Sequence, residues 1–521
     1  MHKKIKLISI AAALICAGTA CLSGCGKKTV DSGSGEQATL RYWMNMTSHA
    51  STVVNNMGDT PLMKKLQEVT RIKISFEHPP QGQTEEKFNL LVASDDCPDI
   101  IQYNWIKYPG GPEKAIKDKI IVDINEYKDH APNLFKYLDE NKEIKKLATT
   151  DSGALFSFPF VRGDDSLLVS YGLIIREDWL KDLGLEMPET IDDWETTLRA
   201  FRDKKGAQAP LSVNWGSMRQ AASFVGAYGT TIGYYVDDGK IKYGMTEPGF
   251  KDFITLMNKW YKEGLLDNNY ATLDQSIQDS NILNGITGVV AGSLGQGIGR
   301  YMNSKPDDKF SLNGAPIPVK NKGDVPEFGA MNVAIPSMYN TFAAISVDSK
   351  HKEEAAKLLD YGYSDEGRML FNFGIEGESY EMIDGYPTYT EKITNNPDGL
   401  AMTVALSQYT YAYDAGPTIQ DKRYMEQYAA LPQQKEAWEI WERTNMKKHV
   451  LPHLYVKENE VNELASLENA VSTYADEMCA KMIMGTEPLE NYDNVVAQLK
   501  ERGLDRILEM KQSAYERYLQ K

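Results

Sequence analysis

A strand–helix–strand pattern begins at Leu40-Arg-Tyr-Trp-Met44, continues through Thr60-Pro-Leu-Met-Lys-Lys-Leu-Gln-Glu-Val69 and returns to a strand at Ile72-Lys-Ile-Ser-Phe76. The helix has threonine at the expected N-cap, proline at its first position and apolar residues at helical spacing. A further helix is expected over residues 84–94 and a third strand over 99–103. Because strands alternate with helices, we expect a mostly parallel sheet covered by helices.

A second alternation of strands and helices starts at residue 172. It comprises a strand at 172–175, helices at 176–183 and 190–201, a hairpin with strands at 232–236 and 241–243, and a helix at 250–263. The Asp238-Gly239 pair between the hairpin strands is a strong turn signal. Since roughly 480 residues exceed what one core supports, the sequence predicts two α/β lobes.

Two later segments are candidates for hinge crossovers between the lobes. The Gly-rich stretch Gly285–Gly299 is interpreted as a turn that returns the chain to the first lobe, and the strand Thr341–Ser346 is the second candidate. A long helix is expected over 352–373, and the pattern is helical from about residue 431 to the end. The predicted fold is therefore α/β, with lobe 1 at 39–157 plus 287–345 and lobe 2, with a helical extension, at 158–286 plus 346–521.

The N-terminus has the order of a signal peptide. Three lysines precede an apolar run from Leu7 to Cys21, which leads into the small-residue box Leu22-Ser-Gly-Cys25. The box resembles a bacterial lipobox. This resemblance implies that residues 1–24 are removed and that Cys25 becomes the acylated first residue, at the extracellular face of the cell membrane; the alternative is an ordinary secretory signal with an incidental cysteine. Residues 25–38 are expected to be a lipidated flexible tether.

Charge and cysteine content limit the partners. The net charge of −16 becomes −19 when the three lysines of the signal are lost, and the basic residues are scattered along the chain. This distribution excludes nucleic acid as a partner. No second apolar run is long enough to span a bilayer, so we expect membrane contact only through the lipid anchor. We expect Cys97 and Cys479 to be two independent buried thiols, with a disulfide as the alternative.

Several runs, spread in order along the chain, carry a family resemblance. They are Ile175–Gly184, Thr190–Trp194, Asp238–Gly244, Trp260–Leu266, Phe373–Gly377 with Tyr380, and Gly503–Leu508. Together with the lipobox, these runs resemble the extracellular solute-binding proteins of family 1, and more narrowly the sugar-binding lipoproteins of Gram-positive ABC importers. The resemblance implies a two-lobe, periplasmic-binding-protein-like clamshell. Such a protein holds an oligosaccharide in the cleft and delivers it to the importer's permease subunits, and we expect a monomer.

A sugar site in water needs flat aromatic faces for the C–H side of each ring and polar groups for the hydroxyls. In an α/β sheet these groups come from loops at the carboxyl ends of strands. The candidates are Trp43, Asn45, Tyr103, Asn104, Trp105, Arg162, Asn214, Trp215, Tyr228, Tyr234, Ser293, Gln296 and Glu376. For Glu376 the alternative is a carboxylate that braces its turn, and for Ser293 and Gln296 it is a tight glycine turn. The tryptophans on amphipathic helices, Trp179, Trp194, Trp260, Trp438 and Trp441, are assigned to packing.

Enzyme motifs are missing from the sequence. Gly295-Gln-Gly297 lacks the third glycine of a nucleotide fingerprint, no Gly-x-Ser-x-Gly elbow occurs, and Pro452 interrupts a zinc face between His449 and His453. We therefore expect neither catalysis nor a cofactor or metal. One alternative is a surface glycoside hydrolase or lyase that uses acids such as Asp164-Asp165. The other is a receptor for a peptide or another polar solute, or a sensor subunit.

Overall fold

The computed structural model describes residues 39–94, 96–221, 224–305 and 309–521. The signal peptide, Cys25 and the tether lie outside the described residues. Two main sheets each have their own hydrophobic core. We call the residues that pack around the first sheet the first lobe, and those around the second sheet the second lobe.

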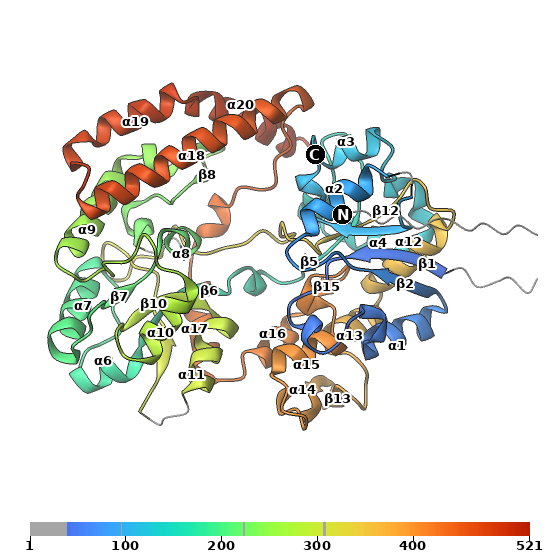
Figure 1. Cartoon of the computed structure of the whole chain (residues 1–521), viewed down its shortest axis with the longest axis horizontal. Helices are drawn as coiled ribbons and strands as arrows, with labels where there is room; N and C mark the ends of the chain where they lie inside the picture. The colour runs from blue at the N-terminus through green and yellow to red at the C-terminus, as the bar shows by residue number, and fades with distance from the viewer. Residues whose placement is uncertain (1–38, 95, 222–223, 306–308) are drawn as a thin grey trace, which may run out of the picture. The chain divides into compact units, whose positions relative to one another are not determined.

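The first sheet has the order β2-β1-β3-β12-β4 (Figure 1). Strand β1 (Thr39–Met44) pairs in parallel with β2 (Lys73–Glu77) and β3 (Ile100–Tyr103). Strand β12 (Phe342–Ile345) runs antiparallel to β3 and to β4 (Phe158–Pro159). The carboxyl ends of β1 and β3 therefore meet the amino end of β12 at one edge of the sheet.

Local signals form the helices between these strands as expected. The Thr60 side chain accepts a hydrogen bond from Met63 N and caps α1 (Pro61–Thr70), which buries Leu62 and Leu66. Helix α2 (Thr84–Val92) precedes β3. The strand–helix–strand prediction for residues 40–103 is thus confirmed.

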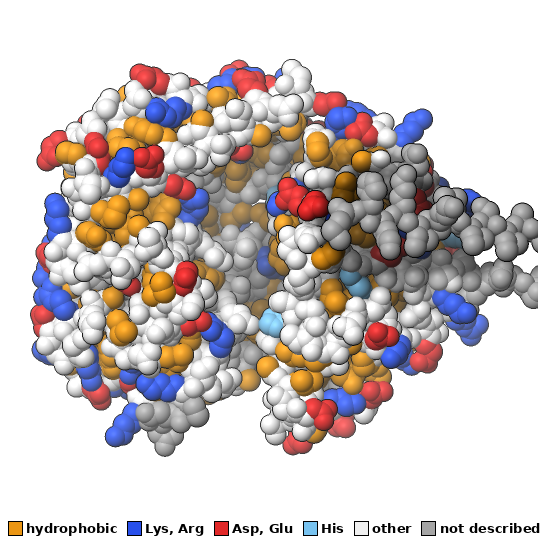
Figure 2. All heavy atoms as spheres, viewed as in Figure 1, with side chains coloured by type: hydrophobic (Ala, Val, Ile, Leu, Met, Phe, Trp, Pro, Cys, Tyr) orange, Lys and Arg blue, Asp and Glu red, His pale blue; other side chains and the backbone are white. Residues whose placement is uncertain are grey.

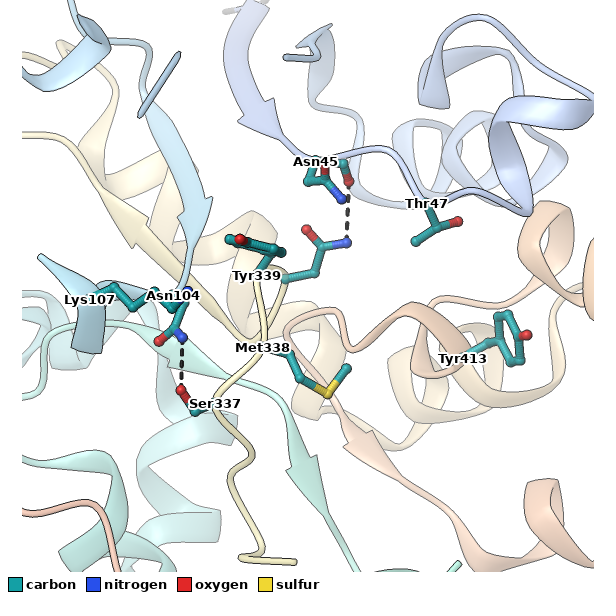
Figure 3. A pocket seen from close by; sticks show the side chains of 9 residues that line it. Asn45, Thr47, Asn104, Lys107, Ser337, Met338, Tyr339 and Tyr413 are labelled. Atoms are coloured by element: carbon teal, nitrogen blue, oxygen red, sulfur yellow. Dashed lines mark hydrogen bonds between the residues drawn. The ribbon is translucent and has the colours of Figure 1, made fainter. Parts of the chain in front are cut away.

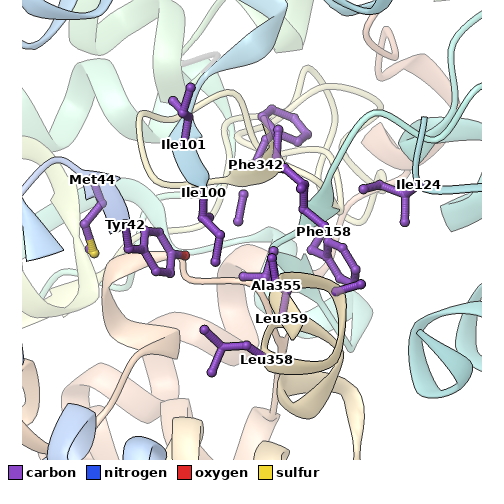
Figure 4. Close-up of a cluster of buried hydrophobic side chains, with 14 of the residues drawn as sticks. Tyr42, Met44, Ile100, Ile101, Ile124, Phe158, Phe342, Ala355, Leu358 and Leu359 are labelled. Carbon is purple, nitrogen blue, oxygen red and sulfur yellow. The ribbon is translucent and has the colours of Figure 1, made fainter. Parts of the chain in front are cut away.

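The core of the first lobe joins strands and helices from distant parts of the chain. Figure 4 shows Tyr42, Ile100, Phe158, Phe342 and Leu359 converging, which come from β1, β3, β4, β12 and α12 (Lys352–Asp360). All five side chains are almost fully buried. Burial of apolar surface on this scale is the main stabilising contribution to such a lobe.

The second sheet has the order β11-β6-β10-β7. Strand β6 (Tyr171–Arg176) runs antiparallel to β10 (Val289–Ser293) and β11 (Leu312–Gly314), and β10 is parallel to β7 (Leu211–Ser212). The prediction that Gly285–Gly299 returns the chain to the first lobe is therefore wrong. Residues 289–293 form an inner strand of the second sheet, and a π-helical turn, η8 (Leu294–Gly299), follows it.

The other predicted elements of the second lobe are confirmed. Gly184, in the left-handed conformation, ends α6 (Glu177–Leu183), and a capping box starts α7 (Ile191–Lys205). The turn at Asp238-Gly239 joins β8 (Tyr234–Asp237) to β9 (Lys240–Tyr243). Helix α9 spans Pro248–Lys262.

The long helix expected over 352–373 is instead two helices. Between α12 and α13 (Asp365–Phe373), the Ser364 side chain accepts a hydrogen bond from Gly367 N and starts a new helix. Apolar residues keep helical spacing across the break between the two helices, so the sequence pattern alone does not reveal the cap at Ser364. Both helices contribute to the first-lobe core, whereas residues 346–521 had all been assigned to the second lobe.

The C-terminal region is largely helical, as predicted. It comprises α17 (Pro432–Glu442), α18 (Val461–Met484), α19 (Tyr492–Glu501) and α20 (Leu504–Leu519). Figure 1 shows α18 lying along α9 and α20 beside it, and both helices add side chains to the second-lobe core.

The remaining helices are short. They are α3 (Gly111–Lys117), α4 (Pro132–Glu140), α5 (Lys142–Ala148), α8 (Trp215–Ala221), α10 (Gln275–Leu283), α11 (Arg300–Ser304), α14 (Glu391–Thr394), α15 (Met402–Tyr409) and α16 (Lys422–Tyr428). The remaining strands are β5 (Val161–Arg162), β15 (Ile419–Gln420) and the hairpin β13 (Tyr380–Ile383) and β14 (Tyr386–Tyr389). Helix α15 packs on α1 and so belongs to the first lobe.

Surface charge and thiols agree with the sequence. Figure 2 shows acidic and basic side chains interspersed over the face in view, without a stripe of one sign. Cys97 and Cys479 are free thiols, which confirms that they are independent. Cys479 is buried as predicted, whereas Cys97 is only partly buried.

Candidate ligand-binding site

Three asparagines meet at the edge of the first sheet where strands of opposite direction come together. Asn45 follows β1, Asn104 follows β3, and Asn340 lies two residues before β12. All three line a cavity of about 440 Å³, together with Lys107, Tyr339 and other residues (Figure 3). Strand ends of this kind are where α/β proteins hold ligands.

Hydrogen bonds hold the three amides in fixed orientations. Asn340 Nδ2 donates to Asn45 O at 3.2 Å, and Asn104 Nδ2 donates to Ser337 Oγ at 2.8 Å. Thr84 Oγ1, from the start of α2, donates to Asn45 Oδ1 at 2.8 Å. The Oδ1 atoms of Asn104 and Asn340 have no hydrogen-bond partner among the described residues, although both side chains are nearly fully buried.

A tyrosine presents an aromatic face beside these amides. Tyr339 is 39% exposed, and its ring lies 6.0 Å from that of Tyr103. Lys107 Nζ lies 5.2 Å from the centre of the Tyr339 ring. An exposed ring next to fixed amides supplies the two kinds of contact that a sugar needs.

A second cavity, of about 800 Å³, is linked to the first by ring contacts between their lining residues. On the first-lobe side it is lined by His49 and by residues between 394 and 404, and on the second-lobe side by residues between 295 and 304. The ring of Tyr413, in the first cavity, lies 5.6 Å from that of His49 and 6.1 Å from that of Tyr428, both in the second. We call the two cavities together the groove.

The groove is close to neutral. Among the described residues, no Asp or Glu lines either cavity. Arg300 lines the second cavity, but its guanidinium is engaged by both oxygens of Asp279, at 2.5 and 2.6 Å. Lys107 Nζ lies 4.0 Å from Glu85. Burial lowers the pKa of His49, which keeps its imidazole uncharged at neutral pH.

The structure brings three of the predicted residues into the groove. Asn45 and Asn104 line the first cavity, and the exposed Gln296 lines the second. Ser293 is adjacent to Gln296 in the fold, where its hydroxyl accepts a hydrogen bond from Gln296 N and caps η8.

Trp43, Tyr103 and Trp105 require a correction. They are 5%, 1% and 0% exposed and pack around Phe88 of α2, so they belong to the core and not to the groove wall. Helix α2 covers these rings, a contact that the strand pattern alone did not reveal. The five tryptophans assigned to packing are buried as expected.

The other candidates on the second lobe have structural partners. Asn214 Oδ1 accepts from Ser217 N at the start of α8, and Trp215 Nε1 donates to Asp476 of α18. Tyr228 and Tyr234 are half-buried at the edge of the second-lobe core. None of these four lines the cavities that form the groove.

Arg162 and Glu376 also lie apart from the groove lining. Arg162 is in β5, its Nη1 donates to Val333 O at 3.4 Å, and burial lowers its pKa to about 10, which leaves it charged at neutral pH. Glu376 is exposed at a different surface cavity, beside Tyr380, with which it forms an isolated β-bridge.

Sequence reasoning missed the segment from Ser337 to Asn340, together with Tyr413 and Tyr428. The rule that strand carboxyl ends carry ligand groups points away from Asn340, because β12 is antiparallel and presents its amino end. The adjacent Tyr339-Asn340 pair, an aromatic and an amide just before a predicted strand, was the available signal.

The described part of the chain has neither a metal-binding cluster nor a helix that could span a bilayer. No cluster of three or more His, Cys, Asp or Glu side chains there has the arrangement of a metal site. None of the described helices combines the length and apolarity needed to cross a bilayer.

Comparison with known proteins identifies the family. The profile of the bacterial extracellular solute-binding proteins matches residues 58–369, which is more than half of the chain. The chain therefore belongs to this family of solute-binding proteins, as the sequence runs indicated.

Relatives match over most of their length. Lipoprotein LipO of Bacillus subtilis (strain 168) is 27% identical over 79% of each chain. The fructooligosaccharide ABC transporter substrate-binding protein FusA of Streptococcus pneumoniae serotype 4 is 24% identical over 99% of each chain. The structure of FusA in complex with kestose has a TM-score of 0.70, at 21% identity and covering 93% of this chain and 100% of that chain. The HMO-binding solute-binding protein of Bifidobacterium longum infantis has a TM-score of 0.73, at 18% identity and covering 93% and 99%. These similarities confirm the predicted solute-binding fold.

Proposed function

We propose that this solute-binding protein is a lipid-anchored extracellular receptor that captures an oligosaccharide in the groove and delivers it to the permease subunits of an ABC importer. The observation that carries the proposal is the lining of the groove. The lining combines fixed amides at strand ends with tyrosine faces, and ring contacts from Tyr413 to His49 and Tyr428 link the two cavities. A string of sugar rings presents the complementary surface, with apolar C–H faces and hydroxyl edges.

The names of two relatives support the ligand class. FusA is named for fructooligosaccharides and the Bifidobacterium longum infantis protein for HMO binding. The lipobox at Leu22–Cys25 supports anchoring through Cys25, and the relative LipO is itself named a lipoprotein. Delivery to an importer rests on the same family membership.

In the proposed function, the protein makes and breaks no covalent bond in its ligand. Two of the acids that are adjacent in sequence act as helix caps: Asp164 accepts from Ser166 N, and Asp193 completes the capping box of α7. Incubation with oligosaccharides is therefore expected to release no new reducing ends. Catalytic turnover of a glycan would contradict the proposal and favour the hydrolase alternative.

Tyr339 offers a direct test of sugar stacking. Tyr339→Ala removes the ring from the cavity wall, and we expect affinity for the bound oligosaccharide to fall about tenfold, which corresponds to about 1.4 kcal/mol of binding free energy. Tyr339→Phe keeps the ring and is the matched control. Isothermal titration calorimetry on both variants decides the point: equal affinity of Tyr339→Ala and the unmodified protein would remove this ring from the site.

A further inference from the structure

Two buried acceptor atoms in the first cavity lack donors. Asn104 and Asn340 are only 1% and 5% exposed, and the Oδ1 atom of each has no hydrogen-bond partner among the described residues. Buried polar groups in folded proteins almost always have partners, and those that lack one call for an explanation. Both residues line the same cavity, so a ligand there is the simplest source of the two missing donors.

The orientation of Asn340 is set by its surroundings. Its Nδ2 donates to the backbone carbonyl of Asn45, an atom that can only accept. The amide nitrogen must therefore face Asn45, which leaves the oxygen as the atom without a partner. Asn104 Nδ2 donates to Ser337 Oγ, and Asn104 Oδ1 has no partner among the described residues. Because the Ser337 hydroxyl can donate as well as accept, the orientation of Asn340 is the one that its surroundings fix.

Free acceptors select the chemistry of the ligand. A sugar hydroxyl donates a hydrogen bond, whereas an ionised carboxylate has only acceptor atoms and would face two amide oxygens without a bond. Two cations line the groove among the described residues. Arg300 is paired with both oxygens of Asp279, and Lys107 Nζ has Glu85 at 4.0 Å and the centre of the Tyr339 ring at 5.2 Å. Arg162, which is buried and charged, lines neither cavity.

We propose that the groove selects a neutral oligosaccharide, one ring of which donates hydroxyl hydrogen bonds to Asn104 Oδ1 and Asn340 Oδ1 against the face of Tyr339. This inference rests on the proposed function and narrows its substrate class to sugars that present hydroxyl donors, and not a carboxylate, to these two oxygens. The site discriminates against an acidic sugar wherever the carboxylate oxygens of that sugar, which can only accept, would face the two amide oxygens, which also only accept.

The test compares matched trisaccharides with the full mature protein. Calorimetry is run with the neutral probes kestose, maltotriose, cellotriose and xylotriose, with trigalacturonic acid as the acidic probe, and with trialanine as a peptide probe. We expect at least one neutral probe to bind, with an affinity that changes less than about twofold between low salt and about 0.5 M NaCl, because no ion pair forms. Trigalacturonic acid is expected not to bind.

Two variants of Asn104 test the donor requirement. Asn104→Leu keeps the side-chain size but removes the acceptor. We expect its affinity for the neutral probe to fall at least about tenfold. Asn104→Asp keeps acceptor oxygens, one of which the Ser337 hydroxyl can satisfy. We expect its affinity for the neutral probe to stay within about threefold of that of the unmodified protein. Thermal unfolding of both variants confirms that they fold.

The outcomes separate this inference from the proposed function. Salt-sensitive binding of trigalacturonic acid, or neutral binding that is unchanged in Asn104→Leu, would overturn the inference and leave the oligosaccharide receptor standing. Binding of trialanine with no binding by any saccharide would overturn both.

Discussion

At the scale of single residues, one buried glutamine holds the backbone of Asn340 in place beside the first cavity. The hydroxyls of Tyr42 and Tyr411 both donate to Gln102 Oε1, and Gln102 Nε2 donates to Asn340 O at 2.7 Å. Gln102 is fully buried in β3. Burial, reinforced by Tyr411, raises the pKa of Tyr42 well above its usual range, so this hydroxyl stays a donor. Gln102 is a positioning residue, since it holds the backbone of Asn340 and lines no cavity of the groove.

Gln102→Leu is predicted to cost both stability and affinity. It removes the acceptor of the Tyr42 and Tyr411 hydroxyls and the donor to the Asn340 carbonyl in the core, and we expect the free energy of unfolding to fall by about 3 kcal/mol. Tyr42→Phe is the control, because Gln102 keeps its bond from Tyr411, and the expected cost is about 1 kcal/mol. Urea unfolding measures stability and calorimetry measures binding. Equal effects of the two variants would show that Gln102 does not organise the cluster.

At the scale of elements, predictions succeeded where the signal was local. The cap at Thr60, the glycine stop at Gly184 and the Asp238-Gly239 turn depend on neighbouring residues, and each appears in the structure. The pairing of residues 289–293 with β6 and β7 depends on distant segments. The prediction that this stretch returns the chain to the first lobe was therefore wrong. Sequence position next to a strand does not tell which rings a neighbouring helix will cover.

The same distinction explains the site. Asn45 and Asn104 were predicted because they follow parallel strands, and both line the first cavity. Trp43 and Trp105 are next to them in sequence but are covered by α2, through Phe88. Asn340 was missed because its strand runs the other way.

Close packing of η8 against Tyr428 gives a prediction at this scale. A Cβ at Gly295 would lie 2.0 Å from Tyr428 Oη, which is far inside van der Waals contact. Gly295→Ala is therefore expected to displace the Tyr428 ring and weaken ligand binding about five- to tenfold, a cost of about 1 kcal/mol. Gly216→Ala is the control, because its nearest neighbour, Asn214 Oδ1, lies at an ordinary 3.4 Å. Calorimetry on both variants checks this; unchanged binding in Gly295→Ala would mean that Tyr428 does not touch the ligand.

At the scale of the whole molecule, the C-terminal helix connects the two lobes. Leu504 and Ile507 of α20 lie in the second-lobe core. At the other end of the helix, Arg517 Nε donates to Asp151 Oδ2 at 2.7 Å, and Lys521 Nζ donates to Thr149 O at 2.7 Å. Residues 149–151 follow α5 of the first lobe. One helix thus packs in one lobe and bonds to the other.

Arg517→Ala is predicted to loosen this connection without disturbing either core. We expect the free energy of unfolding to fall by only about 1 kcal/mol, since both partners are partly exposed. Amide hydrogen exchange is expected to speed up in residues 149–153 and 515–521 together, because these segments lose their shared tie. Exchange in α1 and β2, within the first lobe, is expected to stay unchanged.

Arg506 provides the control on the same helix. Its carboxylate partners, Glu460, Glu463 and Glu509, all lie at α18 or α20. Arg506→Ala therefore removes three ion pairs within the second lobe, against the one ion pair that Arg517→Ala removes. If α20 connects the lobes through Arg517, only Arg517→Ala speeds exchange at residues 149–153. The same acceleration in both variants would show that the first lobe senses the general stability of α20, and that the bond to Asp151 is not a specific tie between the lobes.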